Sequence, residues 1–151
     1  MKNIILCLAS IFFLVGCNPS DQSTIPGLEG ISDVNHSITL QDPLILDVDN
    51  MLSLAINNHS SNAIWFPPDF NIRLFILEEN TWVEIYDSLI PSGDLTLYPA
   101  DEGGIGLLVF KPSIPIEEIS LLRVVIVGNI IETGKPTLSL VGAFLDIPLP
   151  P

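Results

Sequence analysis

Cysteine is scarce in this chain of 151 residues: Cys7 and Cys17 are its two cysteines, and both lie near the N-terminus. The sequence after Cys17 therefore offers no thiol for a disulfide, a metal site or nucleophilic catalysis. Histidine is as rare, with His36 and His59 each in a polar stretch. Zinc sites and catalytic triads need clustered histidines or a reactive nucleophile beside a base. We therefore expect a protein that is not an enzyme and has no cofactor.

Positive charge is also sparse, because five Lys and Arg residues face eighteen Asp and Glu residues, for a net charge of −13. Nucleic acids and anionic bilayers repel such a surface, so we expect no nucleic-acid partner. The acidic pairs, such as Glu78-Glu79 and Asp101-Glu102, stand in predicted turns. Carboxylates in turns are ordinarily solvated, and adjacency in sequence does not make them a catalytic acid and base.

The longest apolar run at the N-terminus, Ile4 to Val15, is too short to cross a bilayer, which takes about 20 residues. Lys2 precedes this run, and the sequence Leu14-Val15-Gly16-Cys17 ends it. A positive residue followed by a short apolar segment is typical of a secretory signal. An ordinary signal peptide is the alternative, but its cleavage site prefers a small residue where Leu14 stands.

Leu14, Val15, Gly16 and Cys17 resemble the lipobox of bacterial lipoprotein signal peptides at all four positions. The resemblance implies cleavage between Gly16 and Cys17 and acyl chains, such as palmitate, on Cys17. It also implies attachment to the membrane through that lipid. Asn18 stands where an aspartate would favour retention at the inner membrane, which indicates the outer membrane in a diderm cell. In a monoderm cell the address is the outer face of the cytoplasmic membrane.

Three segments follow from composition. Residues 1–16 are the predicted signal peptide, and residues 17–37 are predicted to be the lipidated cysteine and a flexible tether, because they are rich in Ser, Asp, Asn, Gly and Pro. Residues 38–151 are predicted to form one folded domain.

Alternating apolar residues and frequent turn signals predict strand after strand from Ile38 onward. We expect an all-β fold, an antiparallel β-sandwich of about eight strands. Two irregularities are predicted. Asp42-Pro43 should interrupt the first strand, and a β-bulge near Gly142 should let both Leu138 and Val141 face the core.

The rhythm of these strands resembles immunoglobulin-like and fibronectin-III-like domains of bacterial envelope proteins. The resemblance covers residues 38–148 and implies a sandwich fold. The disulfide pair of antibody domains is absent from the sequence. A jelly roll or a small barrel is the alternative architecture.

Two stretches are candidates for binding. Trp65, Phe66 and Phe70 flank two prolines and form either a partner-binding loop or a cap on the core. Asp47, Asp49 and Asn50 are a weak calcium candidate, because calcium needs six to eight oxygen ligands.

The sequence thus favours a lipid-anchored, non-enzymatic interaction or assembly module with a protein partner in the cell envelope. One alternative is a carbohydrate-binding accessory domain that uses Trp65, Trp82 or Tyr86 as its sugar platform. A protease-inhibitor-like sandwich with a projecting loop is another.

Overall fold

The computed structural model describes residues 25–46, 51–85, 88–89, 93–109 and 119–149. All regular structure in these residues is β-strand, as predicted. No helix in the described part of the chain has the length and apolar character needed to span a membrane.

Ten strands occupy the described residues: β1 (Ile38–Leu46), β2 (Met51–Asn58), β3 (Ile64–Phe66), β4 (Arg73–Glu78), β5 (Thr81–Ile85), β6 (Ser88–Leu89), β7 (Leu95–Leu97), β8 (Glu102–Val109), β9 (Leu121–Glu132) and β10 (Lys135–Pro148). β4 and β5 form a hairpin around Glu79, and the two longest strands, β9 and β10, form the last hairpin.

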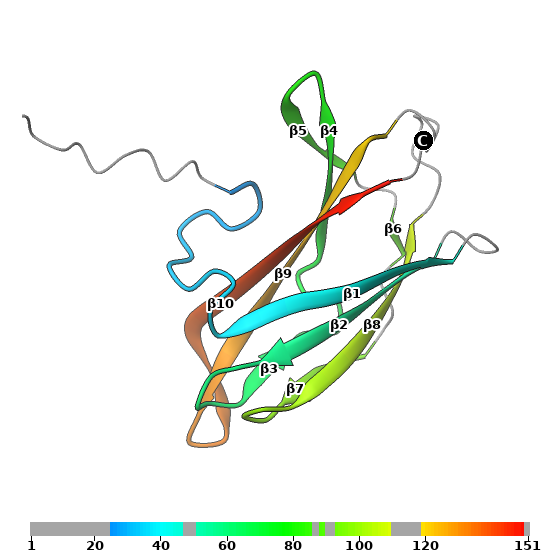
Figure 1. Ribbon diagram of the computed structural model, residues 1–151. Helices are drawn as coiled ribbons and strands as arrows, with labels where there is room; N and C mark the ends of the chain where they lie inside the picture. The colour runs from blue at the N-terminus through cyan, green and yellow to red at the C-terminus, as the bar shows by residue number, and fades with distance from the viewer. Residues whose placement is uncertain (1–24, 47–50, 86–87, 90–92, 110–118, 150–151) are drawn as a thin grey trace, which may run out of the picture.

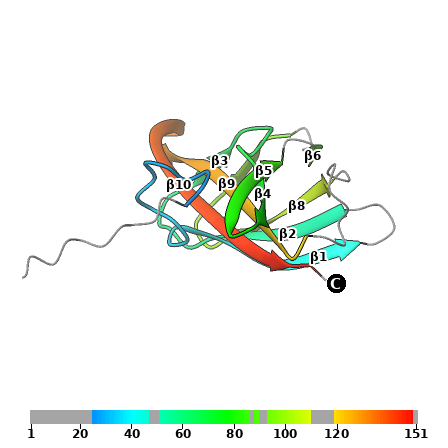
Figure 2. The ribbon, with the colours of Figure 1, turned by 90° about the horizontal axis from the view of Figure 1, so that it is seen from above.

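The strands form two antiparallel sheets (Figures 1 and 2). The first has the order β1-β2-β8-β6. In the second, β10 pairs with one edge of β9, while β4 and β3 pair with successive parts of the other edge. β5 then extends the sheet beyond β4, and β7 extends it beyond β3. The all-β fold and the antiparallel β-sandwich are therefore confirmed, with ten strands in the described residues where about eight were predicted.

The main core lies between the two sheets and consists of the inward-facing half of each alternating strand. Gly128 on β9 shows how closely it is packed. A Cβ atom there would lie 2.7 Å from the Ile64 side chain and 2.8 Å from the Phe66 ring. The fully buried members of this core include Ile38, Leu52, Leu54, Ile56, Ile64, Phe66, Leu74, Ile76, Ile105, Val124 and Ile126.

The predicted interruption of β1 is confirmed. The register with β2 shifts between Gln41 and Leu44, and Asp42 has a positive φ of 51°. Pro43 has no N–H to donate, so the strand can tolerate it only where the ladder is broken.

The predicted bulge near Gly142 is wrong. The pairing of β10 with β9 is regular from Leu140 to Pro148, and the register shifts instead between Pro136 and Leu140. The prediction assumed that Leu138 and Leu140 face the core, but their exposed fractions are 98% and 44%. Val141 and Ala143 do face the core, so the strand never changes faces.

The predicted tether contains folded chain. Residues 25–37, which we call the strap, pack on the outer face of the second sheet beside β10 and lead into β1 (Figure 1). The tether was predicted because neither a strand nor a helix period is present. The strap instead has an apolar residue at every third position.

Candidate interaction surface

The strap begins with two successive turns, from Ile25 to Ile31. The Leu28 N–H donates to the Ile25 carbonyl at 3.0 Å, and the Ile31 N–H donates to the Leu28 carbonyl at 3.1 Å. Gly27 and Gly30 occupy the third position of each turn, with φ of 90° and 78°. A type II turn needs a positive φ at this position, which glycine adopts without strain. The turns repeat every three residues, so the apolar residues of the strap recur at that spacing.

These apolar residues pack on the outer face of the second sheet and form a small second core there. Gly142 on β10 is essential to the fit, because a Cβ atom at this position would lie 2.5 Å from the Leu28 side chain. Its buried members are Leu28, Phe75, Val125 and Val127, and its half-buried members are Ile25, Ile31, Val34, Trp82 and Phe144.

The C-terminal end of the strap is held by backbone hydrogen bonds to β10. Val34 forms a parallel bridge with Gly142. The Asn35 N–H donates to the Gly142 carbonyl at 2.9 Å, and the Gly142 N–H donates to the Asp33 carbonyl at 2.9 Å. The Asn35 side-chain oxygen accepts from the Phe144 N–H at 2.9 Å. The strap thereby pairs part of the β10 edge, which would otherwise be open to strand addition.

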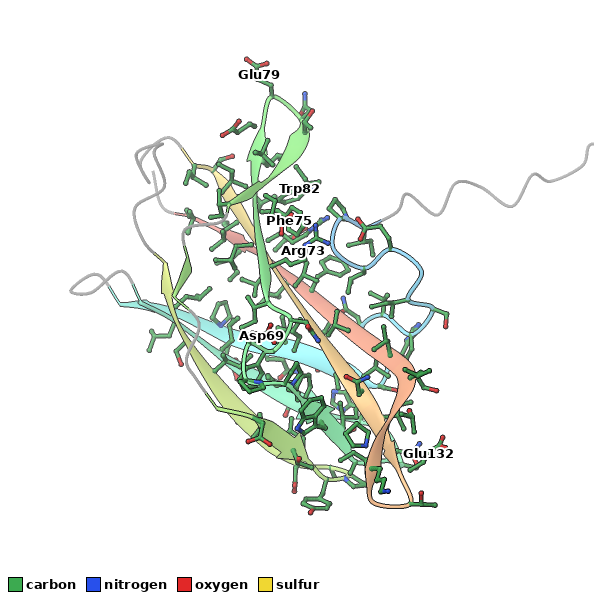
Figure 3. All side chains as sticks on the ribbon, turned by 180° about the vertical axis from the view of Figure 1, so that it is seen from behind. Asp69, Arg73, Phe75, Glu79, Trp82 and Glu132 are labelled. Atoms are coloured by element: carbon green, nitrogen blue, oxygen red, sulfur yellow. The ribbon has the colours of Figure 1, made fainter. Side chains whose placement is uncertain are left out.

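A row of charged and aromatic side chains lies beside the strap on the same face (Figure 3). Arg73 makes two hydrogen bonds of 2.7 Å to the Glu84 carboxylate and lies over the Phe75 ring. Arg123 makes bonds of 2.6 and 2.8 Å to the Asp146 carboxylate.

Arg123 also lies over two aromatic rings, with its guanidinium carbon 3.9 Å from the centre of Trp82 and 4.8 Å from the centre of Phe144. Planar bidentate pairing combined with stacking is particular to arginine. The row therefore holds the aromatic residues of β5 and β10 in place at one end of the strap.

Glu29 links the strap to this row. Its carboxylate accepts from the Gly27 N–H at 3.0 Å and lies 3.5 Å from Arg73. The pKa of Glu29 is lowered mainly by the backbone hydrogen bond from Gly27, with a smaller contribution from the Arg73 charge. Because the folded-state pKa is lowered, this stabilisation is present above the ordinary pKa and is lost as the pH falls through the folded value.

We expect acid to loosen the strap through Glu29. As the pH falls through the lowered pKa of Glu29, the carboxylate becomes protonated, and the backbone amide signals of Gly27 and Leu28 should shift, measured by NMR. Glu29 is exposed, so we expect an effect on strap docking below about 1 kcal/mol. Glu29→Gln should remove this titration, whereas the control Glu132→Gln, on the far hairpin, should retain it. An identical acid transition in Glu29→Gln would contradict the assignment.

The same outer face continues toward the β9–β10 turn. Trp65 on β3 pairs with Asn129 on β9, and Asn129 pairs with Leu140 on β10, so the three lie in one row. Leu140 is 44% exposed, and Leu138, two residues earlier in the chain, is 98% exposed. We call Trp65, Leu138 and Leu140 the hairpin-end patch.

The structure separates the three residues of the predicted aromatic loop. Phe66 and Phe70 are buried and stack with ring centres 5.8 Å apart, so they belong to the core. Trp65 points to the outer face, is half-buried, and donates its indole N–H to Asp94 at 3.3 Å. Trp65 alone of the three is placed to meet a partner.

Of the other candidate residues, some lie in the described part of the chain and the rest lie outside it. Trp82 is stacked under Arg123, and His59 is hydrogen-bonded to the Thr39 hydroxyl at 2.8 Å. In the part of the chain that the structure describes, no group of three or more His, Cys, Asp or Glu residues could hold a metal ion. The remaining candidates lie outside the described residues: Gly16, Cys17, Asp47, Asp49, Asn50 and Tyr86.

Neither a protein-family model nor a curated protein matches this sequence. The surface therefore has to be interpreted from its own chemistry. Sequence reasoning missed the strap, although the residues Ile25, Leu28, Ile31 and Val34 carried the signal, since an apolar residue stands at every third position.

Proposed function

We propose that this protein is a lipid-anchored, non-enzymatic interaction or assembly module of the cell envelope. The lipobox resemblance at Leu14 to Cys17 supports the anchor, through acyl chains on Cys17. The hairpin-end patch supports the interaction. In a diderm cell the proposed location is the outer membrane, and in a monoderm cell it is the outer face of the cytoplasmic membrane.

The single observation that carries the proposal is the exposure of apolar side chains at the β9–β10 turn end of the second sheet. Single exposed leucines are common on protein surfaces. Here, however, Leu140 lies in the same row as Trp65, and the neighbouring Leu138 is almost fully exposed. Tryptophan is enriched at the centres of protein interfaces. We therefore expect a protein partner whose contact surface is apolar at its centre. Because this chain is acidic, we also expect basic residues at the rim of the partner's contact surface.

The double substitution Leu138→Asp and Leu140→Asp should abolish partner capture and leave stability nearly unchanged. Both side chains are exposed, so the free energy of unfolding should change by less than about 0.5 kcal/mol for each. The measurement is chemical cross-linking in the native envelope followed by capture of the tagged protein. Leu44→Asp, on the other sheet and 56% exposed, is the matched control.

The proposal requires that the wild type and Leu44→Asp capture the same protein and that the double variant does not. Capture that is equal in all three would reject the patch as the contact. Retention of the wild type on purified peptidoglycan or other glycan, without a protein, would favour the carbohydrate-binding alternative. Trp65→Ala should then abolish that retention.

A further inference from the structure

We propose that the outer face beneath the strap is a peptide-binding surface and that the strap is its displaceable occupant. The partner segment that replaces the strap has an apolar residue at every third position, with glycine between them. This inference rests on the proposed role of the protein as an interaction module. It adds a second recognition surface and specifies the chemistry of its ligand.

The strap packs in a core of its own. Leu28 and its neighbours contact Phe75, Val125 and Val127 on the outer face, whereas the main core lies on the opposite face of the same sheet. The inward-facing residues of β9, such as Val124 and Ile126, do not belong to the strap cluster. The strap can therefore leave without opening the main core.

The attachment of the strap is uneven along its length. Its backbone hydrogen bonds to β10 involve Asp33 and Asn35, at the C-terminal end. Within the described residues, the backbone hydrogen bonds of the segment from Ile25 to Ile31 lie in the strap's own turns, so side chains provide the contact with the sheet. Glu29 and Arg73 add an exposed ion pair at 3.5 Å, which contributes little. Such a segment opens locally at a lower free energy than the core strands.

The face selects a particular ligand. Gly142 leaves a notch into which the Leu28 side chain fits, and a Cβ atom there would close it. On the ligand side, a Cβ atom at Gly27 would lie 3.1 Å from the Phe75 ring and 3.2 Å from Val125. Because Gly27 also has a φ of 90°, which other residues rarely adopt, the ligand needs glycine directly before the leucine that enters the notch. Proline at Pro26 suits the second position of a type II turn.

Exchange is favoured over simple opening, because the vacated face is apolar. Phe75, Val125 and Val127 are each less than 10% exposed with the strap in place. Leaving them in water costs about 25 cal/mol for each Å² uncovered. A partner segment that re-covers them removes this cost. Leu140 of the hairpin-end patch lies two residues from Gly142 on the same face, so a partner held there is close to the strap.

The test uses the mature chain in detergent and a fluorescein-labelled peptide with the sequence of residues 25–37. Leu28→Asp combined with Ile31→Asp should prevent the chain from seating its own strap. We expect the peptide to bind this variant at least tenfold more tightly than the wild type, measured by fluorescence anisotropy. The resident strap of the wild type competes at an effective concentration on the order of millimolar. A peptide carrying Gly27→Val should not bind.

Binding of the peptide to neither chain would overturn the proposal, as would equal binding to both chains or equal binding of the Gly27→Val peptide. Near-UV circular dichroism verifies that the variant retains its core. A second measurement needs no variant: millimolar peptide should increase amide hydrogen exchange at Leu28 and Ile31 of the wild type and leave Val124 unchanged. Unchanged exchange at all three would also overturn the proposal.

The outcomes also separate this inference from the proposed function. If the peptide fails to bind while Leu138→Asp with Leu140→Asp still abolishes partner capture, only the peptide-binding surface is rejected. If the peptide binds while no protein is captured through the hairpin-end patch, the proposed contact at that patch is rejected instead.

Discussion

Replacing Phe66 by alanine should lower the free energy of unfolding by about 3–5 kcal/mol, the usual cost of removing a buried phenylalanine. The ring is fully buried, stacks on Phe70 and lies against the backbone of Gly128. Gly128 has no side chain with which to fill the cavity, so little of the loss can be recovered. Urea denaturation followed by circular dichroism measures the change.

Trp65→Ala is the matched control, because Trp65 is the neighbouring residue and points to the opposite face of β3. Its indole is half-buried and makes one hydrogen bond, to Asp94. We expect a loss of about 1 kcal/mol. If the two substitutions were equally destabilising, the assignment of Phe66 to the core and Trp65 to the surface would be wrong.

Cys17→Ser should release the protein from the membrane. The predicted acyl chains are attached to Cys17, and each buried CH₂ group contributes about 0.8 kcal/mol to membrane binding. Two or three chains therefore hold a protein almost irreversibly. Without them, the cleaved protein should appear in the soluble fraction, and any protein that stays with the membrane should still carry its signal peptide. Membrane fractionation and intact mass measure the two effects, since acylation adds several hundred daltons.

Cys7→Ser is the control for this substitution, because Cys7 lies within the apolar run and outside the sequence Leu14 to Cys17. It should leave both the mass and the membrane association of the mature protein unchanged. Membrane association that survives Cys17→Ser after cleavage would contradict the lipid anchor.

The sandwich could be predicted because its strands have one buried face and one exposed face, and a period of two records this directly in the sequence. β2 is the clearest case, since Leu52, Leu54 and Ile56 are buried and the residues between them are half-buried. The break at Pro43 was predictable for an equally local reason, the missing N–H.

The same reasoning from a period of two gave a wrong prediction for β10. Leu138 and Leu140 are as apolar as Val141 and Ala143, and periodicity assumes that apolar residues face the core. β10 instead exposes Leu138 and Leu140, and Leu140 lies in the same cross-strand row as Trp65, with Asn129 between them. This departure from the pattern lies in the surface that we propose for the partner. Local rules are expected to fail where a protein serves a contact beyond its own fold.

The strap could not be predicted from the periods of regular structure. Its turns repeat every three residues, which is neither the period of a strand nor that of a helix. Its glycines and proline are typical of a flexible linker. The fit between Leu28 and Gly142 joins residues far apart in the chain, and no local signal records it.

With the proposed lipid anchor on Cys17, the docked strap would limit the height at which the domain stands above the bilayer. Eight residue steps separate Cys17 from Ile25, and a fully extended chain covers at most about 3.6 Å for each step. A domain anchored at Cys17 thus stays within about 29 Å of its lipid while the strap is docked. Releasing the strap as far as Ile38 raises this limit to about 76 Å. A partner that takes the place of the strap would therefore also allow the domain to stand farther from the membrane surface.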